Sequence, residues 1–299
     1  MSEPRVTAGL PGRVGVIGLG VMGFPIGSRL LGAGWEVVAY SLPPSRIDEL
    51  VAAGATAAND AASLGSMADV VIVSLPTEQD VRDAVLGESG IARVKTTPRL
   101  VIDTSTIDPD ASRMIAADLR SFGIGYVDAP VSGGPAAAAS GTLSVMVGGS
   151  DDDLAAARPV LSTIAGVITH CGEVGAGQVC KACNQLIVMG TLELVAEVLA
   201  LAERSGLDPR TMREALLAGY ASSRILELHG QRMIDRDFVP GGKARFNLKD
   251  IGIIAKLGDD AKLKMPGFEA SASQLQRLID AGGGELDNSA LITVVEGQQ

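Results

Sequence analysis

Three polar side chains stand at helical spacing in an otherwise apolar stretch of the chain: Lys181, Asn184 and Gln185. Residues three and four apart lie on the same face of an α-helix, so the ammonium and both amides would share one face. A lysine whose pKa is lowered by burial or by a neighbouring cation can donate a proton to a developing alkoxide. The spacing indicates Lys181 as a general acid and base, with the two amides positioning it and the substrate; the alternative is a solvated polar stripe.

A glycine-rich run, Gly18-Leu19-Gly20-Val21-Met22-Gly23, directly follows the apolar residues Val14 to Ile17. In such a G-x-G-x-x-G run the first glycine allows a tight turn, and the second lets the backbone approach a pyrophosphate. The third lets helix and strand pack closely. The N-terminus of the following helix adds unpaired N–H donors and a partial positive charge. The run predicts a dinucleotide site made by all six residues; the alternative is a purely structural turn.

The end of the second predicted strand bears on the choice between NAD and NADP. An NAD site usually has an acidic residue about 20 residues after the glycines, where it accepts from the ribose 2′-hydroxyl and repels a 2′-phosphate. Ser41 stands at that position, and Arg46 follows it. Because a hydroxyl and a guanidinium can hold a phosphate, the sequence favours NADP over NAD. Arg46 could instead be a solvated residue near Asp48 and Glu49.

A second glycine-containing turn, Ser132-Gly133-Gly134, follows a predicted strand. Consecutive backbone N–H groups and a hydroxyl suit a carboxylate better than a neutral group. The turn is therefore a candidate site for a substrate carboxylate; the alternative is a glycine-rich turn without a ligand.

Short apolar runs alternate with amphipathic stretches in the first half of the chain. Strands are predicted at 14–17, 36–40, 69–76, 99–106, 123–130 and 142–149, with helices from 23 and at 47–53, 77–86, 109–122 and 151–164. This alternation predicts an α/β fold with a doubly wound, mostly parallel sheet. After His170 the strand runs stop, and helices are predicted at 177–205, 208–217, 248–258 and 267–281. We expect a flexible extension at 1–13, a nucleotide-binding domain at 14–172 and an all-helical domain at 173–299.

The composition excludes several classes of protein. With 25 Lys plus Arg against 35 Asp plus Glu, the chain has a net charge of −10 and a surface that repels nucleic-acid phosphates. The apolar stretch at 186–202 carries Glu193 and Glu197, which favours a buried helix over a membrane span. Three cysteines argue against a disulfide framework and for a reducing compartment. We therefore expect a cytoplasmic protein that binds neither nucleic acid nor membrane.

Cys180 and Cys183 form a C-x-x-C pair without a second such pair. Because the pair falls within a predicted helix, we expect two buried, small apolar side chains and no metal site.

Several motifs follow one another in order: GLGVMG at 18–23, SLP at 74–76, DTST at 103–106, DAPVSGG at 128–134, GAGQVCKACNQ at 175–185 and NLKD at 247–250. In this series the sequence resembles the β-hydroxyacid dehydrogenases, a family that includes 3-hydroxyisobutyrate dehydrogenase and tartronate semialdehyde reductase. The resemblance extends from Gly15 to about Ala290.

The resemblance implies a Rossmann-type domain joined by a long interdomain helix to an all-α domain, with the active site in the cleft between them, and a homodimer or homotetramer. It implies an NAD(P)-dependent oxidoreductase that interconverts a small β-hydroxy acid and its semialdehyde. Lys181 would be the catalytic residue, and Ser132, Gly133 and Gly134 would bind the substrate carboxylate. The cofactor site would further include Leu75, Pro76, Thr106 and Lys249.

One departure bears on the substrate. Many family members have two consecutive asparagines where this chain has Asn184 and Gln185, and the chain is similar there to the tartronate semialdehyde reductases. RDFVP at 236–240 and DNSAL at 287–291 are similar to the same branch. Imine reductases resemble the family but commonly replace the lysine that this chain retains at position 181. Imine reduction and a non-catalytic NADP-binding sensor remain the alternative functions.

Overall fold

The computed structural model describes residues 12–43 and 46–297. The chain divides into two compact units, Met1–Lys181 and Ala182–Gln299. Residues 1–11 of the expected extension lie outside the described residues, and Arg13 already belongs to the first strand. The domain boundary between residues 172 and 173 stays a prediction.

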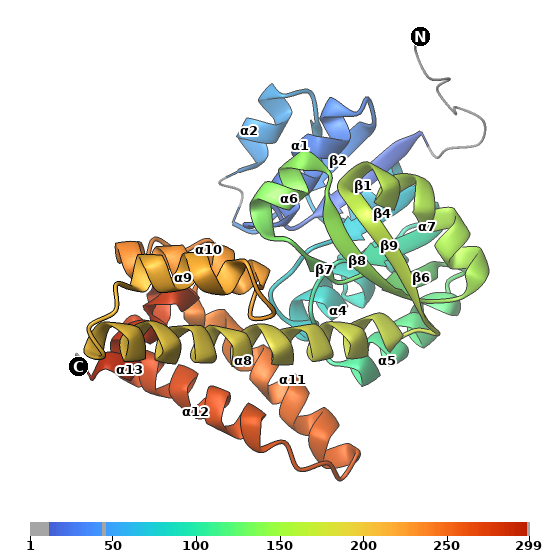
Figure 1. The fold of residues 1–299 in the computed structure, drawn as a ribbon. Coiled ribbons are helices and arrows are strands. Elements are labelled where there is room, and N and C mark those ends of the chain that lie inside the picture. Colours follow the sequence, from blue (N-terminus) through green and yellow to red (C-terminus); the bar gives the residue numbers. More distant parts are fainter. Residues whose placement is uncertain (1–11, 44–45, 298–299) are drawn as a thin grey trace. The chain divides into compact units, whose positions relative to one another are not determined.

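The first unit is built on a sheet whose centre is parallel. Its first six strands are β1 (Arg13–Ile17), β2 (Glu36–Tyr40), β3 (Thr56–Ala57), β4 (Val70–Val73), β5 (Leu100–Asp103) and β6 (Gly125–Asp128). They pair in the order β3-β2-β1-β4-β5-β6, all in parallel (Figure 1). Beyond β6, the strand β8 (Leu143–Gly148) runs antiparallel to β6 and to β7 (Val131–Ser132), and β9 (Ala165–Gly172) pairs in parallel with β8. The predicted mostly parallel sheet is confirmed.

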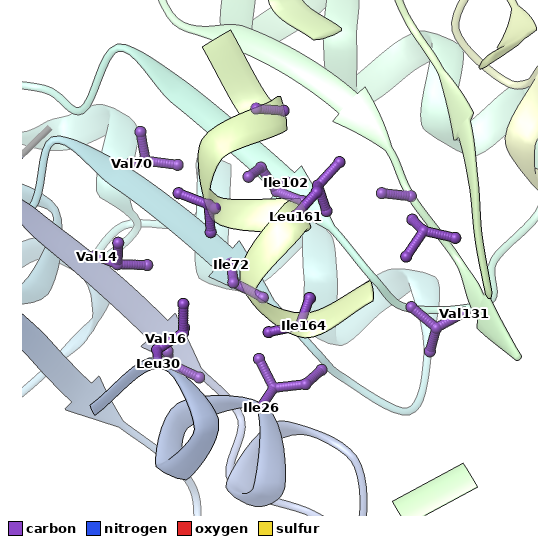
Figure 2. Packing of buried hydrophobic residues seen from close by; sticks show 14 of the residues in the cluster. Val14, Val16, Ile26, Leu30, Val70, Ile72, Ile102, Val131, Leu161 and Ile164 are labelled. Carbon is purple, nitrogen blue, oxygen red and sulfur yellow. The ribbon is translucent and has the colours of Figure 1, made fainter. Parts of the chain in front are cut away.

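Helices cover both faces of this sheet. They are α1 (Gly23–Gly32), α2 (Ile47–Ala52), α3 (Ala61–Met67), α4 (Glu78–Leu86), α5 (Pro109–Arg120), α6 (Gly134–Ser140) and α7 (Asp151–Ile164), with the short 3-10 helix η1 (Ile91–Arg93). Alternate strand residues point to opposite faces. Val16 and Ile72 therefore pack with α1 and α7, whereas Val71 and Val73 pack with α3, α4 and α5. Figure 2 shows the first of these layers, with Ile26 and Leu30 of α1 and Leu161 and Ile164 of α7.

The strand β9 corrects the expectation that the last strand of the chain is the one at 142–149. Its residues are mostly exposed or half-buried, and it pairs with β8 alone. The expectation was wrong because an edge strand with one neighbour buries few side chains and so lacks the apolar run that marks a central strand.

The second unit consists of helices. Helix α8 (Ala176–Arg204) enters it without a break and is followed by α9 (Pro209–Leu217), α10 (Arg224–Asp235), α11 (Asn247–Asp260), α12 (Pro266–Asp280) and α13 (Leu291–Glu296). Short 3-10 helices η2 (Ala244–Phe246), η3 (Gly283–Glu285) and η4 (Asn288–Ala290) lie between them. By length and composition α8 could cross a membrane. Its residues Leu192, Ala196 and Leu199, however, belong to the hydrophobic core of the second unit.

Candidate active site

The carboxyl ends of the parallel strands bring most of the predicted cofactor residues to one edge of the sheet. From β1 the chain proceeds to β2 and β3 on one side, and from β4 it proceeds to β5 and β6 on the other (Figure 1). Sheets of this kind bind ligands at such a reversal, outside the carboxyl ends of the strands. The loops that leave these ends contain Gly18 to Gly23 after β1, Ser41 after β2, Leu75 and Pro76 after β4, and Thr106 after β5.

The glycine run forms the turn between β1 and α1. Gly18 has a φ of +89°, which L side chains rarely adopt, and its N–H donates to the carbonyl oxygen of Tyr40 at 2.9 Å. A Cβ at Gly23 would overlap the carbonyl oxygen of Gly18. Only glycine at position 23 therefore lets α1 begin so close to the end of β1.

The same loop fits a pyrophosphate. In the described part of the chain, the N–H groups of Gly20, Val21 and Met22 have no hydrogen-bond acceptor. A Cβ at Gly20 would meet no atom within 4 Å, so there is room beside the backbone at this point. Unpaired N–H groups at the start of a helix attract anions. The chemistry of the loop thus suits the diphosphate of a dinucleotide, as its sequence predicts.

Ser41 and Arg46, which follow β2, are held by contacts of which the sequence indicated only the one between Arg46 and Glu49. Ser41 is 6% exposed, and its Oγ accepts the N–H of Leu19 at 3.0 Å. The hydroxyl therefore fastens the glycine loop to β2. The guanidinium carbon of Arg46 lies 3.7 Å from the centroid of the Phe24 ring, and its Nε lies 3.7 Å from Oε1 of Glu49. Stacking on Phe24 keeps this cation beside the first turn of α1.

The loops after β4 and β5 are joined to each other. The N–H of Leu75 donates to Oγ of Ser105 at 2.9 Å. The carboxylate of Asp103 is fully buried and accepts from the Ser105 N–H and the Tyr126 hydroxyl, both at 2.9 Å. Burial raises the pKa of Asp103 to about 6, although these hydrogen bonds oppose the shift. The buried carboxyl thereby fixes the loop on which Thr106 lies.

The candidate carboxylate turn begins at the end of β7. Ser132 pairs with Ser144 of β8, and the next two residues have φ values of +131° for Gly133 and +71° for Gly134. These backbone conformations favour glycine. The turn leads directly into α6, so its hydroxyl and successive N–H groups are held in place by a strand on one side and a helix on the other.

Lys181 lies beside this turn. Its Nζ donates to the carbonyl oxygen of Val131 at 2.8 Å, and the residue is only 8% exposed. Val131 is the residue immediately before Ser132. Because a buried ammonium needs polar partners, this hydrogen bond fixes where the charge sits. The structure therefore brings a proton-bearing group and the candidate carboxylate turn together within the first unit.

The second unit holds the predicted amides in a separate polar network. Nδ2 of Asn184 donates to Oε1 of Gln185 at 3.0 Å, and Nε2 of Gln185 donates to Oδ2 of Asp250 at 2.7 Å. The ammonium of Lys249 lies 2.9 Å from Oδ1 of the same carboxylate. Because the Asp250 carboxylate accepts from the NH₂ group of Gln185, it orients this amide so that the amide oxygen faces the NH₂ group of Asn184.

Three buried polar residues were missed by the sequence reasoning. The carboxylate of Asp250 accepts hydrogen bonds from Gln185 and Lys249, as described above. Asp128 is fully buried, and its carboxylate accepts the N–H groups of Gly175 at 2.7 Å and of Gln178 at 2.9 Å. Each of Asp128, Gln178 and Asp250 stands inside one of the quoted motifs, which was the one signal that could have found it.

The expectation that Cys180 and Cys183 are both buried was wrong. Cys183 is exposed and Cys180 is half-buried. Successive helix residues are rotated by about 100°, so Cys183 turns to solvent when Lys181 and Ala182 face inward.

Two family models match consecutive parts of the chain. Residues 13–172 match a family model described as the NAD binding domain of 6-phosphogluconate dehydrogenase. Residues 175–295 match one described as the NAD-binding domain of NADP-dependent 3-hydroxyisobutyrate dehydrogenase.

Curated relatives and solved structures agree with these matches. The 2-hydroxy-3-oxopropionate reductase of Escherichia coli (strain K12) is 36% identical over 95% of this chain and 97% of its own. The 3-hydroxyisobutyrate dehydrogenase of Pseudomonas aeruginosa is 38% identical over 80% of this chain and 83% of its own. The Mycobacterium tuberculosis 3-hydroxyisobutyrate dehydrogenase solved with L-serine is 32% identical and superposes with a TM-score of 0.84 over 95% of this chain and 99% of its own.

Imine reductases are more distant. The enzyme from Myxococcus stipitatus solved with NADP+ is 19% identical, with a TM-score of 0.64 over 95% of this chain and 99% of its own. This likeness concerns the fold alone.

Proposed function

Because the chain belongs to the β-hydroxyacid dehydrogenase family, we propose that it reduces tartronate semialdehyde, which is 2-hydroxy-3-oxopropionate, and oxidises the corresponding β-hydroxy acid. The chain is an NAD(P)-dependent oxidoreductase of small hydroxy acids. The choice of this substrate within the class rests on the likeness to the Escherichia coli reductase and on Asn184-Gln185, RDFVP and DNSAL.

One observation carries the chemical assignment. The buried ammonium of Lys181 donates to the carbonyl oxygen of Val131, and Ser132, Gly133 and Gly134 follow in the chain. A substrate carboxylate bound by the turn would keep the adjoining carbon atoms of a three-carbon acid close to this ammonium. The reaction needs such a group, because the aldehyde oxygen must gain a proton as it becomes a hydroxyl.

The residues of the chain then have distinct tasks. A nicotinamide dinucleotide, when bound, supplies the hydride in reduction and accepts it in oxidation. The N–H groups of the glycine loop hold the diphosphate, and Ser132, Gly133 and Gly134 bind the substrate carboxylate. Lys181 Nζ gives its proton to the aldehyde oxygen in reduction and takes it back from the hydroxyl in oxidation. Asn184 and Gln185 orient the substrate, and the assignments of Pro76, Thr106 and Lys249 to the cofactor rest on the family resemblance.

A spectrophotometric screen tests the function. NADPH and NADH oxidation would be followed with tartronate semialdehyde, methylmalonate semialdehyde, succinic semialdehyde, glyoxylate and a cyclic imine. We expect the highest kcat/KM with tartronate semialdehyde. A higher value with methylmalonate semialdehyde would move the chain to the 3-hydroxyisobutyrate branch, and turnover of the imine alone would overturn the role of Lys181. Tight NADPH binding without turnover of any compound would favour a sensor.

We further propose that NADP is preferred to NAD. The absence of an acid at position 41 and the stacked guanidinium of Arg46 support this preference. Replacing Ser41 by Asp should move the ratio of kcat/KM for NADPH over NADH toward NADH by about tenfold or more, because a carboxylate repels the 2′-phosphate. Ser41→Ala is the matched control. It loses the hydrogen bond from the Leu19 N–H and should weaken the binding of NADPH and of NADH equally. An unchanged ratio in Ser41→Asp would show that position 41 does not decide the preference.

We also propose a cytoplasmic homodimer or homotetramer. The exposed fractions of Ile187, Leu194 and Leu201 are 69%, 61% and 66%. Seven-residue spacing places them on one face of α8, and an apolar stripe of this kind marks a contact with another protein surface. Light scattering that reports a monomer at micromolar concentration would contradict self-association.

A further inference from the structure

We infer that Asp128 and Gln178 are positioning residues for proton transfer. Together they fix the first turn of α8 to the end of β6 and to the loop after β5, and so they determine the position of the Lys181 ammonium. The inference rests on the proposed function of Lys181. It concerns residues of the first unit, all of them buried.

Asp128 caps α8 from a different element of the fold. Helices commonly begin at a residue whose own side chain accepts the first N–H groups. The residue before α8 is Gly175, which has no side chain. The two carboxylate oxygens of Asp128, at the end of β6, instead accept the N–H groups of Gly175 and Gln178. The start of the helix is therefore fixed to the sheet.

A glycine makes this close approach possible. A Cβ at Gly177 would lie 2.8 Å from Oδ2 of Asp128 and would overlap the carbonyl oxygen of Met146. Position 177 thus admits only glycine while the carboxylate holds the helix. In the segment Gly175-Ala176-Gly177-Gln178, the first and last residues donate their N–H groups to Asp128, and Gly177 leaves room for the carboxylate.

Gln178 fastens the same turn to the loop after β5. Its Oε1 accepts the N–H of Ile107 at 3.2 Å, and its Nε2 donates to the carbonyl oxygen of Ser105 at 2.8 Å. The amide therefore bridges the residues on both sides of Thr106, which is expected to contact the cofactor. Gln178 is 1% exposed, so water does not compete for these hydrogen bonds.

These contacts converge on Lys181. Gln178 and Lys181 are three residues apart in α8 and share a face. The Lys181 ammonium donates to the carbonyl oxygen of Val131, the first residue of β7, which lies three residues after Asp128 at the end of β6. The segment 128–131 thus holds α8 at its start and again at the ammonium. A misplacement of about 1 Å can lower a rate about 100-fold. Loss of the Asp128 contact at the start of α8 would therefore lower the rate by displacing the Lys181 ammonium.

The test uses Asp128→Asn and Gln178→Met. The asparagine has nearly the shape of aspartate but turns an NH₂ donor toward a backbone N–H donor, and the methionine removes both hydrogen bonds of the Gln178 amide. We expect kcat with the best aldehyde to fall by roughly 10- to 100-fold in both variants. The Kd for NADPH should stay within about twofold in Asp128→Asn, whose hydrogen bonds do not involve the loop that contains Thr106. The alkaline limb of the kcat profile against pH should also move.

A double-mutant cycle separates positioning from general weakening. If Asp128 acts through Lys181, Asp128→Asn should add nothing to Lys181→Ala. Asp60→Asn is the matched control, because Asp60 caps α3 by accepting the N–H of Ser63 and lies outside the proposed site. It should lower Tm but leave kcat unchanged. Additive effects in the cycle, or a kcat within twofold of wild type in both variants, would overturn the inference.

A measurement that does not depend on turnover tests the inference even if the proposed function is wrong. If the wild-type chain reduces none of the aldehydes, the rate at which Lys181 is acetylated by a small reagent still reports its placement. Asp128→Asn and Gln178→Met should raise that rate severalfold above wild type, with the exposed Lys95 as internal reference. An unchanged rate would refute the inference, whether or not the reaction has been identified.

Discussion

Replacement of Lys181 by alanine is expected to lower kcat by about 100- to 10,000-fold, the usual contribution of a positioned acid or base. The buried ammonium is the group that stands beside the carboxylate turn, and no proton can come from an alanine methyl group. The Kd for NADPH should stay near that of wild type, because the glycine loop is untouched. Stopped-flow measurement of single turnovers, together with fluorescence titration of NADPH, separates the two effects.

Two further variants complete this experiment. Lys181→Met keeps an unbranched side chain without a proton and should be as inactive as Lys181→Ala. Lys95→Ala removes an exposed lysine of the same unit and should behave as wild type. A Lys181→Met enzyme with near-normal turnover would remove Lys181 from the mechanism, and the family resemblance would then have misassigned it.

Gly20→Ala is expected to raise the Kd for NADPH by roughly 10- to 100-fold with little change in Tm. A Cβ at this position meets no protein atom within 4 Å, so the fold accepts the methyl group. The methyl group would occupy the space through which the pyrophosphate approaches the backbone. Isothermal titration and thermal unfolding on the same samples measure the two quantities.

Gly32→Ala is the matched control for this change. Gly32 is the last residue of α1, whereas Gly20 lies in the turn before the helix begins, and a Cβ at Gly32 also meets no atom within 4 Å. Alanine there should leave NADPH affinity unchanged and, if anything, raise Tm because alanine favours helix. Equal affinities for NADPH in Gly20→Ala and Gly32→Ala would mean that the loop does not bind the pyrophosphate.

Much of the architecture follows from local sequence. Strand β4, and β5 as far as Ile102, are continuous aliphatic runs, which are typical of strands buried on both faces of a parallel sheet. Helix α9 begins where Asp208 and Pro209 predict it, since a capping aspartate followed by proline is a local signal. The edge strand β9 carries no such signal, because its pairing with β8 supplies its order.

The sequence by itself determined the chemical groups of this protein: the glycine loop, the Ser132 turn and the lysine of α8 are contiguous motifs whose backbone needs can be recognised locally. Only the tertiary structure showed which other residues hold these motifs in place. Ser41 proved to fasten the glycine loop through Leu19, and Asp128 and Gln178 anchor α8 across 47 to 73 residues of chain. A buried polar residue acquires its role from the partner that folding brings to it, and sequence spacing carries no record of a partner so far away.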